Sequence, residues 1–271
     1  MVTAPNRIVF DHVSVSFRTE SGTLPVVDDV SFTVKDREFV SLVGPSGCGK
    51  TTMLNILAGF VLPTSGSVTL DGAPIAGPSP DRGVIFQEYG VFPWLTVEAN
   101  IEFGLRLRAN LKSVTERTNV CDRYLKLMGL SEFRKAYPRT LSGGMRQRLA
   151  LARAYAVAPQ FLLMDEPFGA LDAQTRTAMQ DLLLEVLQKE GKTVVMITHS
   201  VEEAIYLSSR VVVVSARPSR VRCIVEIPFP YPRTESLHEK PEFLQLRSRI
   251  RDLVMLEYAA QEQQTRDAAP H

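Results

Sequence analysis

A glycine-rich loop between an apolar run and a helical pattern constrains the fold of this chain most strongly. The loop Gly44-Pro-Ser-Gly-Cys-Gly-Lys50-Thr51 fits the pattern GxxxxGK[ST], with an apolar run at residues 39–43 before it and a helical pattern at residues 53–58 after it. Glycines let successive backbone N–H groups turn inward around an anion, and the start of a helix adds the positive end of its dipole. The sequence therefore predicts a phosphate-binding loop in an α/β protein of the P-loop NTPase type.

The same loop predicts which residues contact a nucleotide. A chance match to the pattern in a chain of 271 residues has odds of about one in a hundred. Lys50 brings a positive charge to the outer phosphates, and the Thr51 hydroxyl can ligate Mg²⁺. A thiolate is stabilised at a helix start, so we expect alkylation of Cys48 to block nucleotide binding. The predicted contacts are Gly44, Pro45, Ser46, Gly47, Cys48, Gly49, Lys50, Thr51 and Thr52.

Periodic patterns on either side of the loop predict a layered α/β fold. Residues 8–17 and 30–34 alternate apolar and polar side chains, as half-buried strands of an N-terminal antiparallel β region do. Later apolar runs alternate with helical patterns, which favours a mostly parallel sheet with both faces covered. These runs lie at residues 67–70, 83–86, 161–165, 193–197, 211–214 and 221–227, with a helix expected at residues 174–189.

Helical patterns also define the expected domain organisation. Three of them follow one another between about residues 96 and 157, which predicts a helical subdomain inserted into the sheet-based core. We expect a first domain at residues 1–227, including this subdomain, and a C-terminal extension at residues 228–271. The extension begins with a proline-rich turn, continues as an amphipathic helix, and frays over residues 261–271. We expect the helix to pack on its own domain, with a contact to a partner as the alternative. The three helical patterns cover residues 97–107, 114–128 and 144–156.

Composition narrows the classes of function. The chain has 31 basic and 30 acidic residues, and a net charge of +1 disfavours nucleic acid as the main partner. No apolar stretch approaches the roughly 18 to 20 residues that span a bilayer. The N-terminus lacks the layout of a secretory signal, so we expect a cytoplasmic protein. The three cysteines are scattered, which argues against disulfides and against a zinc site.

Two acidic residues follow the apolar run at residues 161–164. Asp165 can hold Mg²⁺ through its water, and Glu166 can orient and deprotonate an attacking water. An isolated pair of acids would more often be an exposed strand end. With a phosphate loop upstream, the pair predicts hydrolysis of a nucleoside triphosphate.

The segment Leu141-Ser142-Gly143-Gly144-Met145 predicts a second anion-binding helix start. One nucleotide already has a phosphate loop, so a second such helix end suggests that two copies of the chain share each nucleotide. A plain helix cap would be the preferred interpretation if these residues stood alone.

These motifs together resemble those of the ATP-binding cassette (ABC) ATPases over nearly all of residues 7–227. The resemblance implies that Ser142, Gly143 and Gly144 contact ATP held by the opposite subunit. It implies that Gln87 reaches Mg²⁺ and the attacking water, and that His199 contacts the γ-phosphate. Residues 170–172 resemble the D-loop at the dimer seam, which gives Asp172 a place beside the opposite nucleotide. Phe17 falls where the family stacks an aromatic ring on adenine, although a core position in the first strand is the alternative.

A narrower resemblance concerns the kind of ABC ATPase. The chain carries one set of motifs and no fused membrane domain, and residues 86–100 and 165–176 resemble importer ATPases of the nitrate, sulfonate and taurine group. The resemblance implies a homodimer (or a pair with a paralogous ATPase) docked at the cytoplasmic face of the inner membrane. It also implies transmembrane permease subunits and an extracytoplasmic solute-binding protein. The solute stays open among nitrate, an organosulfonate, taurine and a pyrimidine precursor.

Phe92 and Trp94 follow Gln87 closely and raise the question of a docking surface. Exposed aromatic side chains here would offer a groove for a short helix of the permease. Internal packing is the alternative, and both interpretations can hold.

The rival function is that of a soluble, non-transport ABC ATPase acting on nucleic acid or protein complexes. Near-neutral charge and a single short helical insertion count against it.

Overall fold

The chain folds into two units. The computed structural model describes residues 6–20, 22–87, 90–107, 111–169 and 171–267. Unit 1 combines Met1–Pro78 with Thr193–His271, and unit 2 is Ser79–Lys192. None of the helices within the described ranges is long and apolar enough to cross a membrane.

An antiparallel sheet of four strands forms the first part of unit 1, in the order β2-β1-β4-β5. In the long hairpin of β1 and β2, Ile8 pairs with Val34 and Phe10 with Phe32, whose rings stack with centroids 4.5 Å apart. The alternation of apolar residues thus places one face of each strand in the core, as the sequence predicts. The bounds are Asn6–Thr19 (β1), Gly22–Lys35 (β2), Ser65–Leu70 (β4) and Ala73–Pro74 (β5).

The second sheet of unit 1 has β3 (Phe39–Val43) between β8 (Thr193–Ile197) and β9 (Arg210–Val214), all three parallel. β10 (Val221–Glu226) pairs antiparallel with β9. Every residue of β3, β8 and β9 is buried, which explains why their sequences are mostly apolar. Because the three strands are parallel, the turns that follow them emerge at one edge of the sheet.

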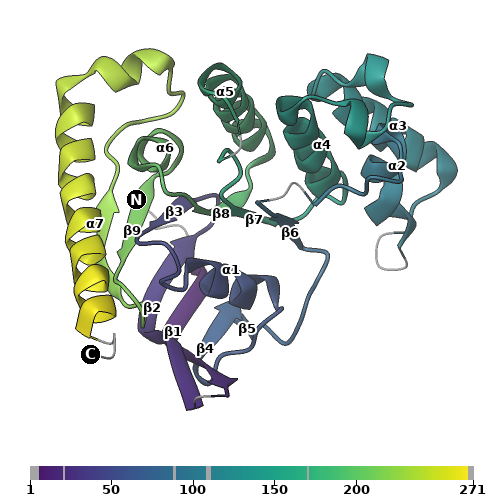
Figure 1. Ribbon diagram of the computed structural model, residues 1–271. Helices are drawn as coiled ribbons and strands as arrows, with labels where there is room; N and C mark the ends of the chain where they lie inside the picture. The colour runs from purple at the N-terminus through teal and green to yellow at the C-terminus, as the bar shows by residue number, and fades with distance from the viewer. Residues whose placement is uncertain (1–5, 21, 88–89, 108–110, 170, 268–271) are drawn as a thin grey trace. The chain divides into compact units, whose positions relative to one another are not determined.

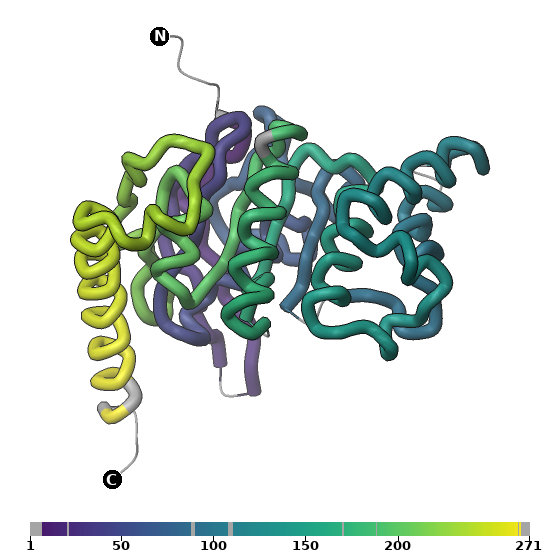
Figure 2. The backbone as a smooth tube through the Cα atoms, turned by 90° about the horizontal axis from the view of Figure 1, so that it is seen from above, coloured from purple at the N-terminus to yellow at the C-terminus, as the bar shows by residue number. Residues whose placement is uncertain are grey.

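Among its described residues, unit 1 also has three α-helices and a short 3₁₀ helix: α1 (Lys50–Ala58), α6 (Val201–Leu207), η5 (Glu235–Glu239) and α7 (Pro241–Asp267). α7 packs beside β9 and α6, along one side of unit 1 in both ribbon views (Figures 1 and 2). The expectation that the chain frays from residue 261 is wrong as far as Asp267, because α7 continues to that residue. Residues 261–264 are glutamine and glutamate, which favour the helix.

Unit 2 contains the parallel pair β6 (Arg82–Ile85) and β7 (Phe161–Asp165) and most of the helices. α2 (Val97–Glu102), α3 (Val114–Leu127) and α4 (Gly143–Ala156) pack together (Figure 1), and α5 (Ala173–Glu190) contacts α4. The helix expected at residues 97–107 is shorter than expected. It changes at Phe103 into a 3₁₀ turn, η1 (Phe103–Arg106), where Gly104 lies against Val157 and a Cβ would come within 2.4 Å of its side chain. Two further 3₁₀ turns are η3 (Ser131–Phe133) and η4 (Pro138–Thr140).

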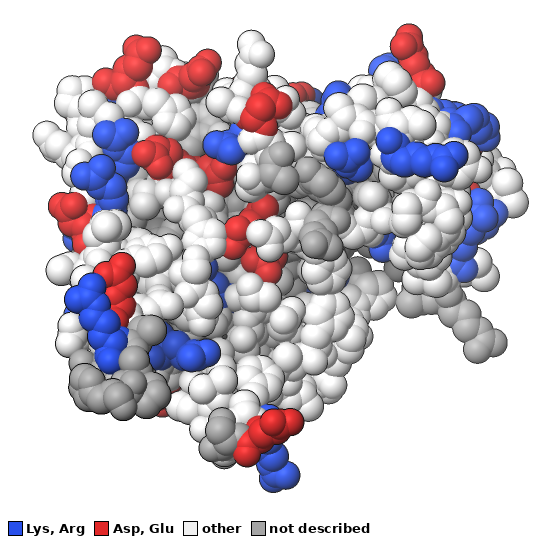
Figure 3. Space-filling model, in the orientation of Figure 1, with Lys and Arg blue, Asp and Glu red and all other residues white. Residues whose placement is uncertain are grey.

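Charged side chains are distributed differently on the two units. In the face shown in Figure 3, acidic and basic groups are interspersed over unit 1, whereas basic groups are more numerous over the helices of unit 2. Ion pairs hold several basic residues of unit 2. Arg134 contacts both Glu98 and Asp122, and Arg123 contacts Glu190.

Candidate active site

The predicted phosphate loop joins the end of β3 to the start of α1 in unit 1. Gly47 and Gly49 have positive φ angles of 70° and 125°, which glycine adopts without strain. A Cβ on Gly44 would lie 2.6 Å from the carbonyl oxygen of Val214, at the end of β9. The loop backbone therefore lies directly against its surroundings, in a conformation that side chains at these glycines would prevent.

Lys50 is the first residue of α1, and its side chain turns back onto the loop. Its side chain is buried, with 4% exposed, and Nζ donates hydrogen bonds to the carbonyl oxygens of Gly44 (2.8 Å) and Pro45 (2.6 Å). The first helical turn also carries Thr51, which is exposed, and Thr52, which is half-buried. A buried ammonium at a helix start concentrates positive charge here, as binding of a polyphosphate requires.

Cys48 does not fit the expectation of a readily alkylated thiol. Its side chain is fully buried, its Sγ lies 3.9 Å from the Lys50 ammonium, and its carbonyl oxygen accepts a hydrogen bond from Ser219 Oγ. A reagent has to enter the protein interior to reach this sulfur. The Cys48 side chain therefore packs in the interior, beneath the backbone of the loop.

His199 follows β8 at the same sheet edge as the phosphate loop. Leu42 of β3 pairs with Ile197 of β8, and Thr198 continues the ladder by donating its N–H to the Leu42 carbonyl (3.3 Å). Thr198 Oγ1 donates to the buried Glu203 of α6 (2.6 Å), which holds the turn in place. His199 is exposed in this turn. Unit 1 thus brings the predicted loop and the predicted histidine to neighbouring strand ends.

Phe17 lies near the end of β1, paired with Leu24 of β2. Its side chain is 38% exposed, so it is not a core residue of the strand. The core alternative for this position is therefore wrong, and part of the side chain is open to a ligand.

The two predicted acids and Gln87 come together in unit 2. Ile85 of β6 pairs with Met164 of β7, so the residues that follow both strands share an edge. Gln87 Nε2 donates to Glu166 Oε2 at 3.3 Å, and Asp165 is the half-buried last residue of β7. Glu166 has a φ of 47°, a strained conformation of the kind that concentrates at functional sites.

The two predicted helix starts also lie side by side in unit 2. Ser142 caps α4 by accepting the Met145 N–H (3.3 Å), and Asp172 caps α5 by accepting the Thr175 N–H (2.9 Å). This hydrogen bond lowers the pKa of Asp172, which is therefore ionised at neutral pH. Gly144 contacts Thr175 so closely that a Cβ would lie 2.4 Å from its Cγ2. Both cap residues are exposed; Ala170 lies outside the described residues.

The aromatic segment after Gln87 divides between two roles. Phe92 is half-buried, with its ring 4.4 Å from that of Phe103 and the Arg153 guanidinium 4.2 Å above it. Trp94 is 70% exposed, and its ring lies 5.4 Å from that of Phe92. Glu88 and Tyr89 lie outside the described residues. Internal packing thus applies to Phe92 and surface exposure to Trp94.

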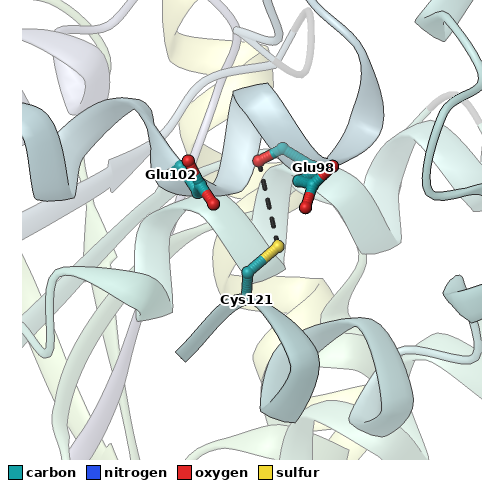
Figure 4. Close-up of side chains that lie close together, drawn as sticks. All are labelled: Glu98, Glu102 and Cys121. Carbon is teal, nitrogen blue, oxygen red and sulfur yellow. Dashed lines mark hydrogen bonds between the residues drawn. The ribbon is translucent and has the colours of Figure 1, made fainter. Parts of the chain in front are cut away.

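One group of potential metal ligands lies elsewhere, on α2 and α3. Glu98, Glu102 and Cys121 place their side chains together (Figure 4). Arg134 and Lys135 pair with Glu98, and Arg106 pairs with Glu102. Burial raises the pKa of Cys121 to about 12, so its thiol stays protonated and points to the Glu98 carbonyl oxygen. Paired carboxylates and a protonated thiol do not fit a metal ion, and the group is a structural ion-pair network.

Several residues that support the site were missed at the level of sequence. Ser200 and Glu203 form the S-x-x-E pattern that marks a helix start, and it would have revealed α6. Ser219, whose hydroxyl reaches the phosphate loop, has no such signal, because it is 171 residues from Cys48 in the sequence.

The chain is similar to known proteins over most of its length. The profile of the ABC transporter family matches residues 27–169. A putative ATP-binding protein of Brucella abortus is 50% identical over 244 residues, which are 90% of this chain and 92% of that protein. The nitrate import ATP-binding protein NrtD of Synechococcus elongatus is 42% identical over 252 residues, 92% of each chain.

A solved structure extends the similarity to the fold. An ATP-binding cassette determined as a dimer in a post-hydrolysis state, bound to ADP and Pi, aligns with a TM-score of 0.72 at 31% identity. The alignment covers 82% of this chain and 100% of that one.

Proposed function

This chain belongs to the ABC transporter family as an ATP-hydrolysing subunit of the importer type, and from that premise we propose that it energises uptake of nitrate, a sulfonate, taurine or a similar small solute. The observation that carries the proposal is the placement of the phosphate loop and His199 at neighbouring strand ends, in a chain 42% identical to a nitrate import ATPase along 92% of its length.

Lys50 and the loop N–H groups bind the phosphates of ATP. The oxygen donors Thr51, Asp165 and Gln87 are of the kind that Mg²⁺ prefers, and they would hold it together with ATP. The ion, when bound, neutralises charge on the phosphates. Phe17 stacks on the adenine through its exposed ring.

Hydrolysis depends on three further residues. Glu166 accepts the proton of the attacking water, and Gln87, which donates to the Glu166 carboxylate, orients that water. His199 donates to the γ-phosphate oxygens, where charge develops in the transition state. The strained backbone of Glu166 and its hydrogen bond to Gln87 support these assignments.

Two copies close head to tail on two ATP molecules. Ser142, Gly143 and Gly144 of one copy, with Asp172, contact the nucleotide held by Lys50 of the other. The exposed cap residues of α4 and α5 support this role, because their adjacent N-termini add two positive dipole ends. The solved cassette that aligns with this chain is itself a dimer.

The partner proteins follow from the importer type. Trp94 and the exposed Phe103 contact permease helices at the cytoplasmic face of the membrane, and a separate extracytoplasmic protein supplies the solute.

Residues 1–227 form the ATPase domain, with its helical subdomain at about 96–157, and residues 228–271 form an extension.

Solute uptake by cells lacking the gene tests the proposal. Wild-type chain should restore uptake of one labelled solute among nitrate, taurine and an alkanesulfonate, because only ATP turnover drives accumulation. Glu166→Gln should not restore it, since loss of a general base costs about 10²–10⁴-fold in rate. Uptake restored equally by the variant, or ATPase activity that responds to nucleic acid and not to the permease, would contradict the proposal.

A further inference from the structure

The C-terminal helix reaches the phosphate loop. α7 faces the sheet of unit 1 with a stripe of buried residues at helical spacing, Phe243, Ile250, Val254 and Glu257. The next position on that stripe is Gln261, whose Nε2 donates a hydrogen bond to the carbonyl oxygen of Ser46 at 3.1 Å. A residue of the extension thus contacts the backbone of the predicted phosphate site.

A second connection runs through the loop between β9 and β10. The Glu257 carboxylate accepts the backbone N–H of Ala216 (3.3 Å) and pairs with Arg222 (2.7 Å). Ser219, in the same loop and fully buried, donates its hydroxyl to the carbonyl oxygen of Cys48. Two carbonyl groups of the phosphate loop therefore accept hydrogen bonds from outside it. The Ser46 carbonyl accepts one from α7 itself, and the Cys48 carbonyl accepts one from the β9–β10 loop, which Glu257 of α7 contacts.

These contacts determine where the loop N–H groups point. In a trans peptide the C=O and the following N–H lie in one plane and point in opposite directions. Holding the Ser46 and Cys48 carbonyls on the protein side turns the N–H groups of Gly47 and Gly49 the other way. Gly47 and Gly49 have no side chain to restrict their backbone angles. Hydrogen bonds from outside the loop therefore have a large effect on the conformation of these two residues.

We propose that α7 is a positioning element of the nucleotide site, in which Gln261 directly and Glu257 through residues 215–219 hold the phosphate-loop peptides in their anion-binding orientation. The proposal rests on the assignment of residues 44–52 to the phosphates. By thermodynamic reciprocity, a nucleotide bound to the loop stabilises the last turns of α7.

Binding of MgADP to the full chain, measured by titration calorimetry, tests the proposal without turnover. Gln261→Met keeps the length and helix preference of the side chain and removes the donor, so binding should weaken about three- to tenfold, the size of one hydrogen bond. Gln264→Met makes the same change at an exposed position of the same helix and should bind as the wild type does. The unfolding temperatures of the two variants without nucleotide should agree.

Equal affinity of Gln261→Met and Gln264→Met would overturn the proposal, as would a weakening explained by a lower unfolding temperature. Lys50→Ala separates this outcome from failure of the loop assignment. If Lys50→Ala binds MgADP normally, the assignment itself is wrong; if it does not bind while Gln261→Met binds normally, only the role of α7 is wrong. In the wild type, MgADP should also slow amide hydrogen exchange in residues 255–265, and unchanged exchange there would count against the proposal.

Discussion

At the residue scale, parts of the candidate site depend on the absence of side-chain atoms. A Cβ on Gly44 would press against Val214, one on Gly49 would lie 2.9 Å from Ser219 Oγ, and one on Gly144 would lie 2.4 Å from Thr175 Cγ2. The first two contacts shape the phosphate loop, and the third sets the spacing of the α4 and α5 starts. Only the third is relieved by deleting a single methyl group, which makes it experimentally tractable.

Gly144→Ala should lower the free energy of unfolding by about 1–3 kcal/mol through overpacking, offset in part by the better helix preference of alanine. ATP-dependent dimerisation should weaken with it, because the helix start has to shift. Urea denaturation and light scattering measure the two effects.

Thr175→Ser provides the matched control for this prediction. It removes the Cγ2 methyl and keeps the hydroxyl, so the double variant should recover most of both losses. If the effects of the two substitutions on the free energy of unfolding simply added, the close contact between Gly144 and Thr175 would not be the cause of the loss.

Most site residues could be predicted from the sequence, for a reason that is local. Gln87, Glu166 and His199 each lie within two residues of the end of an apolar run, and parallel strands bring such residues to one edge within a unit. Gln261 could not be predicted, because its contact with Ser46 joins residues 215 positions apart and depends on how α7 packs. The burial of Cys48 was missed because the loop pattern indicates backbone geometry and not which side chains turn inward.

At the scale of elements, an ion-pair network joins α2 to the segment between η3 and η4. Glu98 accepts hydrogen bonds from Arg134 Nε (2.8 Å) and from Lys135. The Arg134 guanidinium is the main cause of the lowered pKa of Glu98. These contacts hold the segment that precedes the start of α4 against α2.

This network predicts a pH-dependent contribution to stability. Because the pKa of Glu98 is lower in the folded chain than its ordinary value of 4.5, the ion pairs stabilise fully above that value. Their contribution is lost as the pH falls through the lower, folded pKa. Glu98→Gln should therefore reduce the free energy of unfolding by about 1 kcal/mol at pH 7, and the difference from wild type should shrink as the pH falls below 4.5.

Urea denaturation at several pH values measures this dependence, with the exposed Glu132→Gln as a control that should show little change. A Glu98→Gln effect that stayed constant down to acid unfolding would mean that shape, and not charge, accounts for it.

The elements themselves were predictable where their periodicity is strong. The buried strands and the three helical patterns of unit 2 stand out because their apolar residues recur at fixed spacing. α6 was missed because it has only seven residues, and the end of α7 was misjudged because its polar residues carry no periodic signal. Local signals exist in both cases: the S-x-x-E cap of Ser200 and Glu203 at α6, and the helix-favouring residues 261–264 near the end of α7.

At the scale of the whole molecule, the pairing of two copies is the central proposal. Glu166→Gln should bind ATP without hydrolysing it, because the substitution removes the proton acceptor and keeps the shape. The chain should then elute as a dimer with ATP and as a monomer without it, measured by size-exclusion chromatography with light scattering. Adding Lys50→Ala should abolish the ATP-dependent dimer.

A Glu166→Gln chain that stayed monomeric in saturating MgATP would contradict the shared-nucleotide arrangement. A dimer that formed equally without ATP would show that contacts other than the nucleotide join the copies.

The adjacency of β3 and β8 has a consequence for how such a subunit can diversify. Hydrogen-bonded neighbouring strands lie about 4.8 Å apart whatever side chains they carry. The separation between the phosphate loop after β3 and the turn of His199 after β8 is therefore set by the backbone hydrogen bonds between the two strands. Substitutions on the outer helices leave that separation unchanged. Surfaces that meet different transport partners can therefore evolve while the chemistry of phosphate cleavage keeps one fixed geometry.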